Sequence, residues 1–137
     1  MAINNQFSIA VHLMAGLGLN FGKDVTSTSL AQSVNASHSF VRRTLAKLSK
    51  ARLVNASKGK FGKTSLAKEA SQISLLDIYR AVEAPKAFSI HTYPPNASCP
   101  ISCGIKPALE KVLSKTQRSM EESLSQVRLS EVISDLR

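Results

Sequence analysis

Two cysteines and one histidine are the residues of this chain best suited to chemistry: Cys99, Cys103 and His91. Thiolates and imidazoles are ligands of zinc and of iron–sulfur clusters, but the spacing Cys-x-x-x-Cys alone is a weak metal signal. Two other interpretations stand beside metal binding: a thiol redox switch, and small side chains without a chemical role. A helix that begins beside Cys99, together with the nearby Lys106, would favour the thiolate. We treat both cysteines as redox candidates. We expect that they bind no metal and that the protein holds no cofactor.

Basic side chains and glycines form the second group, in the stretch Lys58-Gly59-Lys60-Phe61-Gly62-Lys63. The spacing Gly59-x-x-Gly62 matches neither the P-loop nor the dinucleotide fingerprint, so a nucleotide site is not indicated. No Ser/His/Asp or Cys/His pair is placed like a nucleophile with its base, and the basic half of the chain contains no carboxylate pair. The sequence therefore predicts a binding protein and not an enzyme.

The excess positive charge is confined to one half of the chain. The formal net charge is +9; residues 1–68 contain ten Lys or Arg against a single acid, Asp24, whereas residues 69–137 contain eight of each sign. Such a distribution is expected if one lobe binds a polyanion and the other contacts protein. A basic face kept only for solubility is the alternative, but it gives no reason for the segregation.

The first predicted element is a helix, because apolar residues recur there every three or four positions. They are Phe7, Ala10, Val11, Met14 and Leu17. Gly16, Gly18 and Gly22 are expected to weaken this helix and to end it.

A helix-turn-helix is predicted next. A short helix with Thr26 as its N-cap is followed by a tight turn at residues 35–36, and Ser37 is placed to cap a second helix. The second helix has an apolar side and a basic side, on which Arg42 and Arg43 are expected to be exposed. A short helix, a turn of three or four residues and a basic second helix are the layout of this DNA-binding motif.

Two short extended segments, residues 53–57 and 64–67, flank the basic stretch with its two glycines. Two strands joined by such a loop form a hairpin whose tip can reach a phosphate backbone or a minor groove, the wing of a winged helix. Lys58, Lys60 and Lys63 are the candidate contacts in the wing.

Ser74 and Asp77 have the spacing of a capping box, which predicts a helix from there to about Glu83. All five prolines lie beyond that point. Residues 85–104 are expected to form an irregular connection. Pro107 is expected in the first turn of a last long helix, where its missing N–H costs nothing.

The long helix carries an apolar stripe with too few partners in its own chain. Its members are Leu109, Val112, Leu113, Thr116, Met120, Leu124 and Val127. A helix from a second copy would bury this stripe, so we expect a homodimer. One more short helix is expected over residues 130–136, with Ser130 as its cap.

These patterns predict a mainly α fold with a small β-hairpin: a winged helix-turn-helix followed by a long C-terminal dimerisation helix. The expected organisation is a DNA-binding domain over residues 1–84, a linker or sensor loop over 85–104, and a dimerisation helix with its tail over 105–137. The apolar run at residues 7–19 is too short to span a bilayer and has no leader-like flanks. We therefore expect a cytoplasmic protein without a membrane partner.

Several motifs resemble those of the Rrf2 family of winged-helix transcriptional regulators. They are Leu53-Val54-x-x-Ser57-Lys58-Gly59-x-x-Gly62, Leu66-Ala67, residues 73–83, His91, Asn96-x-x-Cys99-Pro100, Gln117-Arg118-x-Met120-Glu121 and Leu129-Ser130-x-Val132. The resemblance covers nearly the whole chain. It implies a homodimer that binds double-stranded operator DNA, usually as a repressor, with the long helices crossing at the dimer interface.

The resemblance also implies where DNA is contacted: at Ser39, Phe40, Arg42 and Arg43 of the second helix, and at Lys58 of the wing. Ser37, Lys60 and Lys63 complete our candidate set. The family wing commonly has Arg where this chain has Lys58, and Lys cannot make the planar bidentate contact of Arg, so this wing is expected to hold phosphates. Members with an iron–sulfur cluster have three closely spaced cysteines where this chain has two, so a cluster is disfavoured.

The predicted function is that of a homodimeric, sequence-specific DNA-binding transcriptional regulator, a repressor that responds to thiol redox state. Three alternatives remain: a basic RNA- or ribosome-associated protein, a regulator gated by a bound metal or cluster, and a small thiol-dependent enzyme. Binders of single-stranded RNA usually have stacking aromatics among their basic residues, and only Phe40 and Phe61 could serve here.

Overall fold

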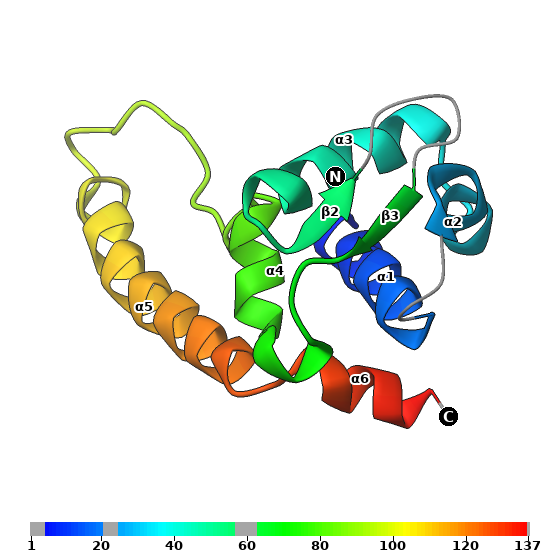
Figure 1. Ribbon diagram of the computed structural model, residues 1–137. Coiled ribbons are helices and arrows are strands. Elements are labelled where there is room, and N and C mark those ends of the chain that lie inside the picture. Colours follow the sequence, from blue (N-terminus) through cyan, green and yellow to red (C-terminus); the bar gives the residue numbers. More distant parts are fainter. Residues whose placement is uncertain (1–4, 21–24, 57–62, 137) are drawn as a thin grey trace.

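The computed structural model describes residues 5–20, 25–56 and 63–136. Over these ranges the chain has six α-helices, one short 3-10 helix and one three-stranded antiparallel sheet. Figure 1 shows one lobe that contains the sheet and all the α-helices except α5, which runs along the outside of the lobe. The mainly α, winged-helix fold predicted from the sequence is confirmed. No helix in the described ranges is long and apolar enough to cross a membrane.

Helix α1 (Gln6–Leu19) lies at the centre of the lobe. Its buried residues include Ala10, Leu13, Met14 and Leu17. The three glycines were predicted to weaken this helix and to end it; α1 continues through Gly16 and Gly18 and ends at Leu19, directly after Gly18. Gly18 permits a close approach to Ile133, which a Cβ at position 18 would overlap. Gly22 lies outside the described residues.

The predicted helix-turn-helix is formed by α2 (Ser27–Val34) and α3 (His38–Lys50). Both predicted caps are confirmed: Thr26 Oγ1 accepts from Ser29 N–H at 3.1 Å, and Ser37 Oγ accepts from Phe40 N–H at 3.2 Å. Asn35 lies in the left-handed region, with φ of 56°, and turns the chain between the two helices. Asn tolerates this conformation better than most non-glycine residues.

The sheet has the strand order β1-β3-β2, with β1 (Val25–Thr26), β2 (Val54–Ala56) and β3 (Lys63–Leu66) all antiparallel. The β2–β3 hairpin is the predicted wing, and residues 57–62 at its tip lie outside the described residues. Strand β1 was not predicted, because two residues are too few to show an alternating pattern. Pairing of β1 with Lys63 and Thr64 ties the start of the helix-turn-helix to the beginning of β3.

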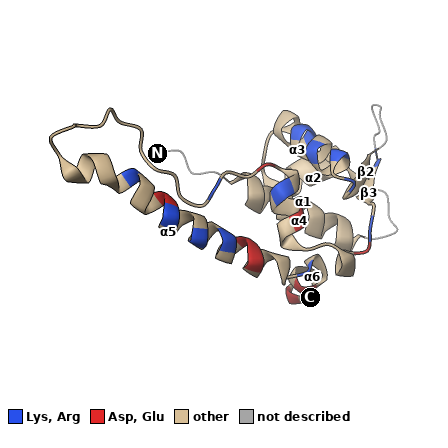
Figure 2. Cartoon of the chain, turned by 90° about the vertical axis from the view of Figure 1, so that its left-hand side faces the viewer, with Lys and Arg blue, Asp and Glu red and all other residues tan. Residues whose placement is uncertain are grey.

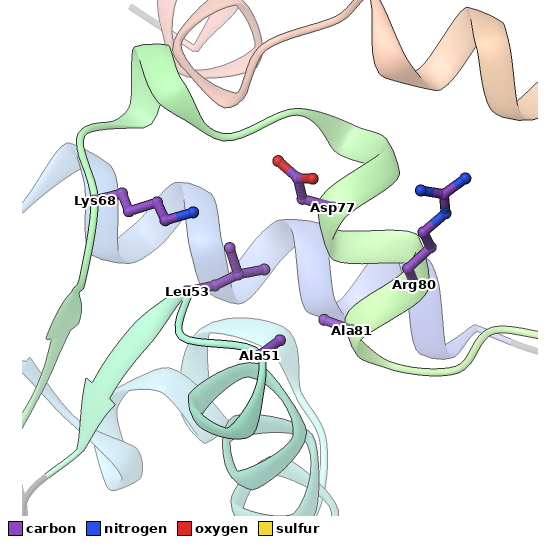
Figure 3. A pocket seen from close by; sticks show the side chains of 6 residues that line it. All are labelled: Ala51, Leu53, Lys68, Asp77, Arg80 and Ala81. Carbon is purple, nitrogen blue, oxygen red and sulfur yellow. The ribbon is translucent and has the colours of Figure 1, made fainter.

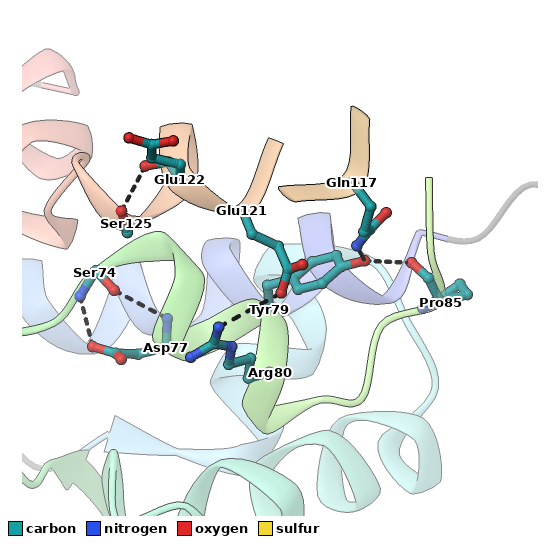
Figure 4. A network of polar contacts seen from close by, with 9 residues as sticks. All are labelled: Ser74, Asp77, Tyr79, Arg80, Pro85, Gln117, Glu121, Glu122 and Ser125. Carbon is teal, nitrogen blue, oxygen red and sulfur yellow. Dashed lines mark hydrogen bonds and ion pairs between the residues drawn. The ribbon is translucent and has the colours of Figure 1, made fainter. Parts of the chain in front are cut away.

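A 3-10 helix, η1 (Ala70–Gln72), leads into α4 (Leu75–Ala81). The predicted capping box is confirmed: Asp77 N–H donates to Ser74 Oγ at 3.1 Å, and Ser74 N–H donates to an Asp77 carboxylate oxygen at 3.0 Å (Figure 4). Satisfying two otherwise unpaired N–H groups favours a helix of only seven residues at this place.

Helix α5 spans Pro100–Ser125 and is longer than predicted. The expected irregular connection therefore ends at residue 99 and not at 104. The prediction for Pro107 was also wrong, because this residue lies inside the helix. It is eight positions into α5, where its missing N–H leaves the carbonyl of Cys103 without the usual helical donor.

The last helix, α6 (Leu129–Asp135), returns to the lobe, where Leu129 and Ile133 are buried in the core. Leu129 N–H donates to Ile73 O at 2.8 Å, and Leu75 N–H donates to Val127 O at 2.9 Å. Residues 1–84 therefore do not complete the core alone, because Leu129 and Ile133 of α6 belong to it. The helix begins at Leu129 with Arg128 in the N-cap position, not with Ser130 as predicted.

Candidate nucleic-acid interface

Helix α3 has one buried apolar face and one exposed basic face. Val41, Thr44, Leu45 and Leu48 are buried. Ser39, Arg42 and Arg43 are exposed on the opposite side, and the helix contains no acidic residue. Figure 2 shows the basic residues of α3 without an acidic neighbour on that helix. The exposure predicted for Arg42 and Arg43 is confirmed.

Two hydrogen bonds stabilise α3 locally, and a third connects it to α4. Ser37 caps its N-terminus, and Thr44 Oγ1 donates to Phe40 O at 2.9 Å. Lys47 Nζ donates to Val82 O at 3.4 Å, at the C-terminal end of α4. Lys47 thus holds α3 against α4, although its charge alone would place it among the candidates for DNA contact.

Phe40 and Arg43 lie next to each other on α3. The guanidinium carbon of Arg43 is 5.9 Å from the centre of the Phe40 ring, and Phe40 is half-buried. This distance is at the outer limit of a cation–π contact. The guanidinium group of Arg43 therefore lies near the Phe40 ring, which presents only part of its surface to solvent.

The candidate residues of the wing are described only in part. Lys63 is exposed at the first position of β3, where it pairs in register with Thr26 of β1. Thr26 caps α2, so Lys63 lies beside the start of the helix-turn-helix. Lys58 and Lys60 lie outside the described residues.

Two exposed basic residues, Lys50 and Arg52, were not among the sequence candidates. Lys50 follows Arg43 by seven residues, and two helical turns place both on the same face of α3. Arg52 is the second residue after α3, with φ of 64°. The helical spacing of Ser39, Arg43 and Lys50 is the signal that would have found Lys50.

The cysteines lie at the start of α5. Cys99 is the N-cap residue, and its sulfur accepts a hydrogen bond from Ser102 N–H at 3.4 Å. Cys103 is exposed, and its thiol donates to Asn96 O at 3.3 Å. Cys103 N–H donates to Cys99 O at 3.1 Å, so the two residues are one helical turn apart.

His91 is not placed with the two thiols as a ligand set. Its ring stacks on Tyr93, with ring centres 4.7 Å apart and an interplanar angle of 20°. In the described ranges, no three His, Cys, Asp or Glu side chains lie together in a way that could hold a metal ion. The residues present near Cys99 thus do not fit an iron site built from this chain's described side chains.

A small cavity of about 280 Å³ lies between the end of α3 and α4 (Figure 3). Its charged lining residues are Lys68, Asp77 and Arg80. Asp77 belongs to the capping box of α4, and Arg80 lies 3.7 Å from Glu121 of α5. Both of these side chains therefore have local structural partners.

Comparison with known proteins assigns the chain to a family. Residues 3–135 match the Rrf2 family, described as iron-dependent transcriptional regulators. The chain is 33% identical over 135 residues to YwnA of Bacillus subtilis, an HTH-type transcriptional regulator by name, and the match covers 98% of each protein.

Solved structures share the fold. A transcriptional regulator, so named, from Lactobacillus plantarum superposes with a TM-score of 0.81 at 26% identity, covering 98% of this chain and 91% of that one. IscR of T. potens superposes with a TM-score of 0.72 at 23% identity, covering 100% and 89%. The winged helix, its basic α3 and the match along almost the whole chain agree, and the protein belongs to the Rrf2 family of transcriptional regulators, which are DNA-binding proteins and not enzymes.

Proposed function

We propose that the protein is a homodimeric, sequence-specific repressor that inserts α3 into the major groove of an operator. The observation that carries this proposal is the exposed face of α3, where Ser39, Arg42 and Arg43 lie together on a helix without acidic residues. An α-helix fits the major groove, and Arg is the side chain most often used to read guanine there. Such a regulator acts at the chromosome, in the cytoplasm.

We assign different tasks to the two parts of the interface. Arg42 and Arg43 read bases, whereas Ser37 and Ser39, at the start of α3, hold a phosphate, as hydroxyls and N–H groups at helix N-termini commonly do. Lys58, Lys60 and Lys63 of the wing, together with Lys50, hold the phosphate backbone. We infer repression from the family resemblance and from steric exclusion: a dimer bound to the operator would prevent RNA polymerase from binding there.

The dimer is proposed to form on the outer face of α5. Most of the apolar stripe predicted from the sequence is half-buried within the chain itself: Leu109, Leu113, Met120, Leu124 and Val127. A second stripe lies on the outer side of α5, and its members follow each other at steps of four, three and four residues: Ile101, Ile105, Ala108 and Val112. Ile105 is half-buried and the other three are exposed; Val112 also belongs to the predicted stripe. Ile101 is 73% exposed and Val112 is 57% exposed. Such spacing is that of a helix–helix seam, and a second copy of α5 would bury it.

The proposed organisation thus has three parts: a DNA-binding lobe that includes α6, a linker that ends at Cys99, and the dimerisation helix α5. A two-fold axis through the α5 pair would present two α3 helices to half-sites about one helical turn apart, roughly 34 Å. The operator is then expected to be a pseudo-palindrome.

The decisive experiment begins with selection of bound fragments from genomic DNA, followed by fluorescence anisotropy on the fragment found. The double variant Arg42→Ala/Arg43→Ala is expected to weaken operator binding by at least about 2 kcal/mol and to bind a shuffled duplex almost as well. The matched control is Lys111→Ala/Lys115→Ala, which removes the same charge from the exposed surface of α5. Equal operator affinities of the two double variants would contradict the proposal.

Two further measurements separate the related classes. A single-stranded RNA of the same sequence and length is expected to bind weakly, and tighter binding of RNA than of duplex would favour an RNA-associated protein. Lys63→Ala is expected to weaken all duplexes alike and to lower the salt slope by about one, because a phosphate contact carries no sequence information.

We also propose that Cys99 makes DNA binding sensitive to oxidation. The support is its position: the sulfur accepts a hydrogen bond from Ser102 N–H at the start of a helix of 26 residues. Attack of the Cys99 thiolate on a peroxide breaks the O–O bond, giving a sulfenic acid and releasing hydroxide. The Cys103 thiol then displaces water and forms a disulfide. That bond would break the hydrogen bonds that both sulfurs now make, and thereby uncap α5.

A further inference from the structure

We propose that the cavity between the linker and α5 binds a small organic anion with an apolar body, such as an aromatic carboxylate or sulfonate. The cavity has a volume of about 860 Å³ and lies between residues 85–90 and the part of α5 from Lys106 to Glu121. Pockets for small molecules commonly have volumes of about 300 to 1,000 Å³. This site is independent of whether the protein binds operator DNA.

The linker is attached at two places, one in the cavity lining and one beyond it. At one end, Tyr79 Oη donates to Pro85 O at 2.7 Å, and Ala87 N–H donates to Gln117 Oε1 at 3.0 Å. The amide nitrogen of Gln117 also donates to Tyr79 Oη at 2.9 Å (Figure 4). Gln117 thus joins α4, the linker and α5 at one point.

At the other end, the linker is attached to the first turn of α5. Asn96 N–H donates to Ser102 Oγ at 2.8 Å, and Tyr93 Oη donates to Ser102 O. Between these two attachments the linker arches away from α5, as Figure 1 shows for the yellow-green segment. A loop fixed at both ends keeps the cavity open without a ligand, so binding does not have to form the site first.

The charges that face the cavity favour an anion. Lys86, Lys106 and Arg118 line it together with two acids, Glu110 and Glu121. Glu121 forms an ion pair of 3.7 Å with Arg80, which does not line the cavity. In the lining, Glu110 is then the one acid without that partner, beside three cations. Within the described residues, none of the three cations has a carboxylate at ion-pair distance.

The apolar part of the lining defines the other half of the ligand. Phe88 is 62% exposed although it is aromatic, and Ile90 and Leu113 lie beside it in the cavity wall. A ring or branched chain placed against Phe88 would remove apolar surface from water. Cationic groups and apolar walls in one cavity match a ligand that carries an acidic group on an apolar body.

A second copy of the chain is the main competing occupant, and its proposed contact surface lies elsewhere. At 100° per residue, Glu110, Ser114 and Arg118 lie on one side of α5, and Ile105 and Val112 lie on another. A dimer built on the outer stripe therefore leaves the cavity accessible.

The test uses two fluorescent probes with the same ring system: anilinonaphthalene sulfonate, which is anionic, and phenylnaphthylamine, which is neutral. We expect the full-length protein to bind the sulfonate with one site per chain, and more tightly than the neutral probe. Lys106→Gln/Arg118→Gln is expected to weaken sulfonate binding about tenfold and to leave the neutral probe unaffected. Phe88→Ser is expected to weaken the binding of both probes.

The matched control is Lys111→Gln/Lys115→Gln, which removes the same charge from α5 but not from the cavity lining. Equal sulfonate affinities in the two double variants would overturn the proposal, as would a wild-type protein that binds no sulfonate. If Val112→Glu separates the two copies and the separated protein binds the probe more strongly than the wild type, the proposal would also be overturned. That result would mean that the second copy fills the cavity in the wild-type dimer. Operator binding is measured on the same samples, so that loss of the cavity site is told apart from loss of the DNA-binding function.

Discussion

Gly18 of α1 lies directly against Ile133 of α6, and a Cβ at position 18 would overlap the Cδ1 atom of Ile133. The two residues are far apart in sequence, yet through this contact the last helix, α6, packs against the central helix, α1. Gly16, one half-turn earlier in the same helix, has an ordinary environment, since its Cβ would be 3.6 Å from Leu30 Cδ2.

Gly18→Ala is therefore expected to destabilise the protein, although alanine is the better helix former. Overpacking typically costs about 1 to 3 kcal/mol, against a gain in helix propensity of about 1 kcal/mol. Gly16→Ala is expected to keep the propensity gain and to be neutral or stabilising. Denaturant unfolding followed by circular dichroism compares the two free energies of unfolding.

The double variant Gly18→Ala/Ile133→Val tests the cause, because valine lacks the Cδ1 atom that the new Cβ would meet. We expect it to be more stable than the sum of the single changes predicts. Additive effects, or equal stability of the two Gly→Ala variants, would show that the α1–α6 contact is not the reason for glycine at position 18.

Gln117 is expected to control the mobility of the linker. Gln117→Met removes both hydrogen bonds, to Tyr79 Oη and to Ala87 N–H, while keeping a side chain of similar length. Loss of one such bond costs about 1 kcal/mol, so amide exchange at Ala87 should accelerate several-fold. Hydrogen exchange of Lys115→Met serves as control, and unchanged exchange at Ala87 in Gln117→Met would contradict this role.

Val112→Glu is expected to convert the proposed dimer into a monomer, because it places a charge in the outer stripe of α5. Sedimentation velocity at micromolar concentration measures the change, with Gln126→Glu as a control that adds the same charge beyond the helix end. A dimeric Val112→Glu protein would rule out this surface. Truncation after Gly104 is not a clean test, because it also removes Leu129 and Ile133 from the core of the lobe.

Mild peroxide is expected to weaken operator binding of the wild type about tenfold and to leave Cys99→Ser unaffected. Serine preserves the N-cap hydrogen bond and removes the redox chemistry, so this variant changes only the thiol. Mass spectrometry of the wild type should show the loss of two hydrogens per disulfide. A wild-type protein that is oxidised but binds its operator as before would contradict the proposed switch.

Local signals predicted most of the lobe. Thr26, Ser37 and the Ser74–Asp77 pair each cap a helix through neighbours three residues away, so the sequence alone contains both partners. Gly18 was misinterpreted because its partner, Ile133, is distant in sequence. Pro107 was misplaced because the preference of proline for a first turn is only a preference, and α5 accommodates it eight positions in.

For the candidate site, the sequence predicted which side chains of α3 are exposed but not their contacts with other elements. Helical periodicity alone is enough to expose Arg42 and Arg43, whereas it does not show that Lys47 is held by the carbonyl of Val82. The cavity beside α5 depends on where the linker crosses the helix, and no spacing pattern in residues 85–90 reports that crossing.

The return of α6 to the lobe has a consequence for how the protein folds as it is synthesised. The core needs Leu129 and Ile133, so the lobe remains incomplete until residues far beyond the helix-turn-helix have left the ribosome. Long-range contacts of this kind slow folding relative to a lobe built from local pairs. By that time α5 has also emerged, and the lobe is therefore completed only when the whole of α5, with the surface proposed for dimerisation, is already present.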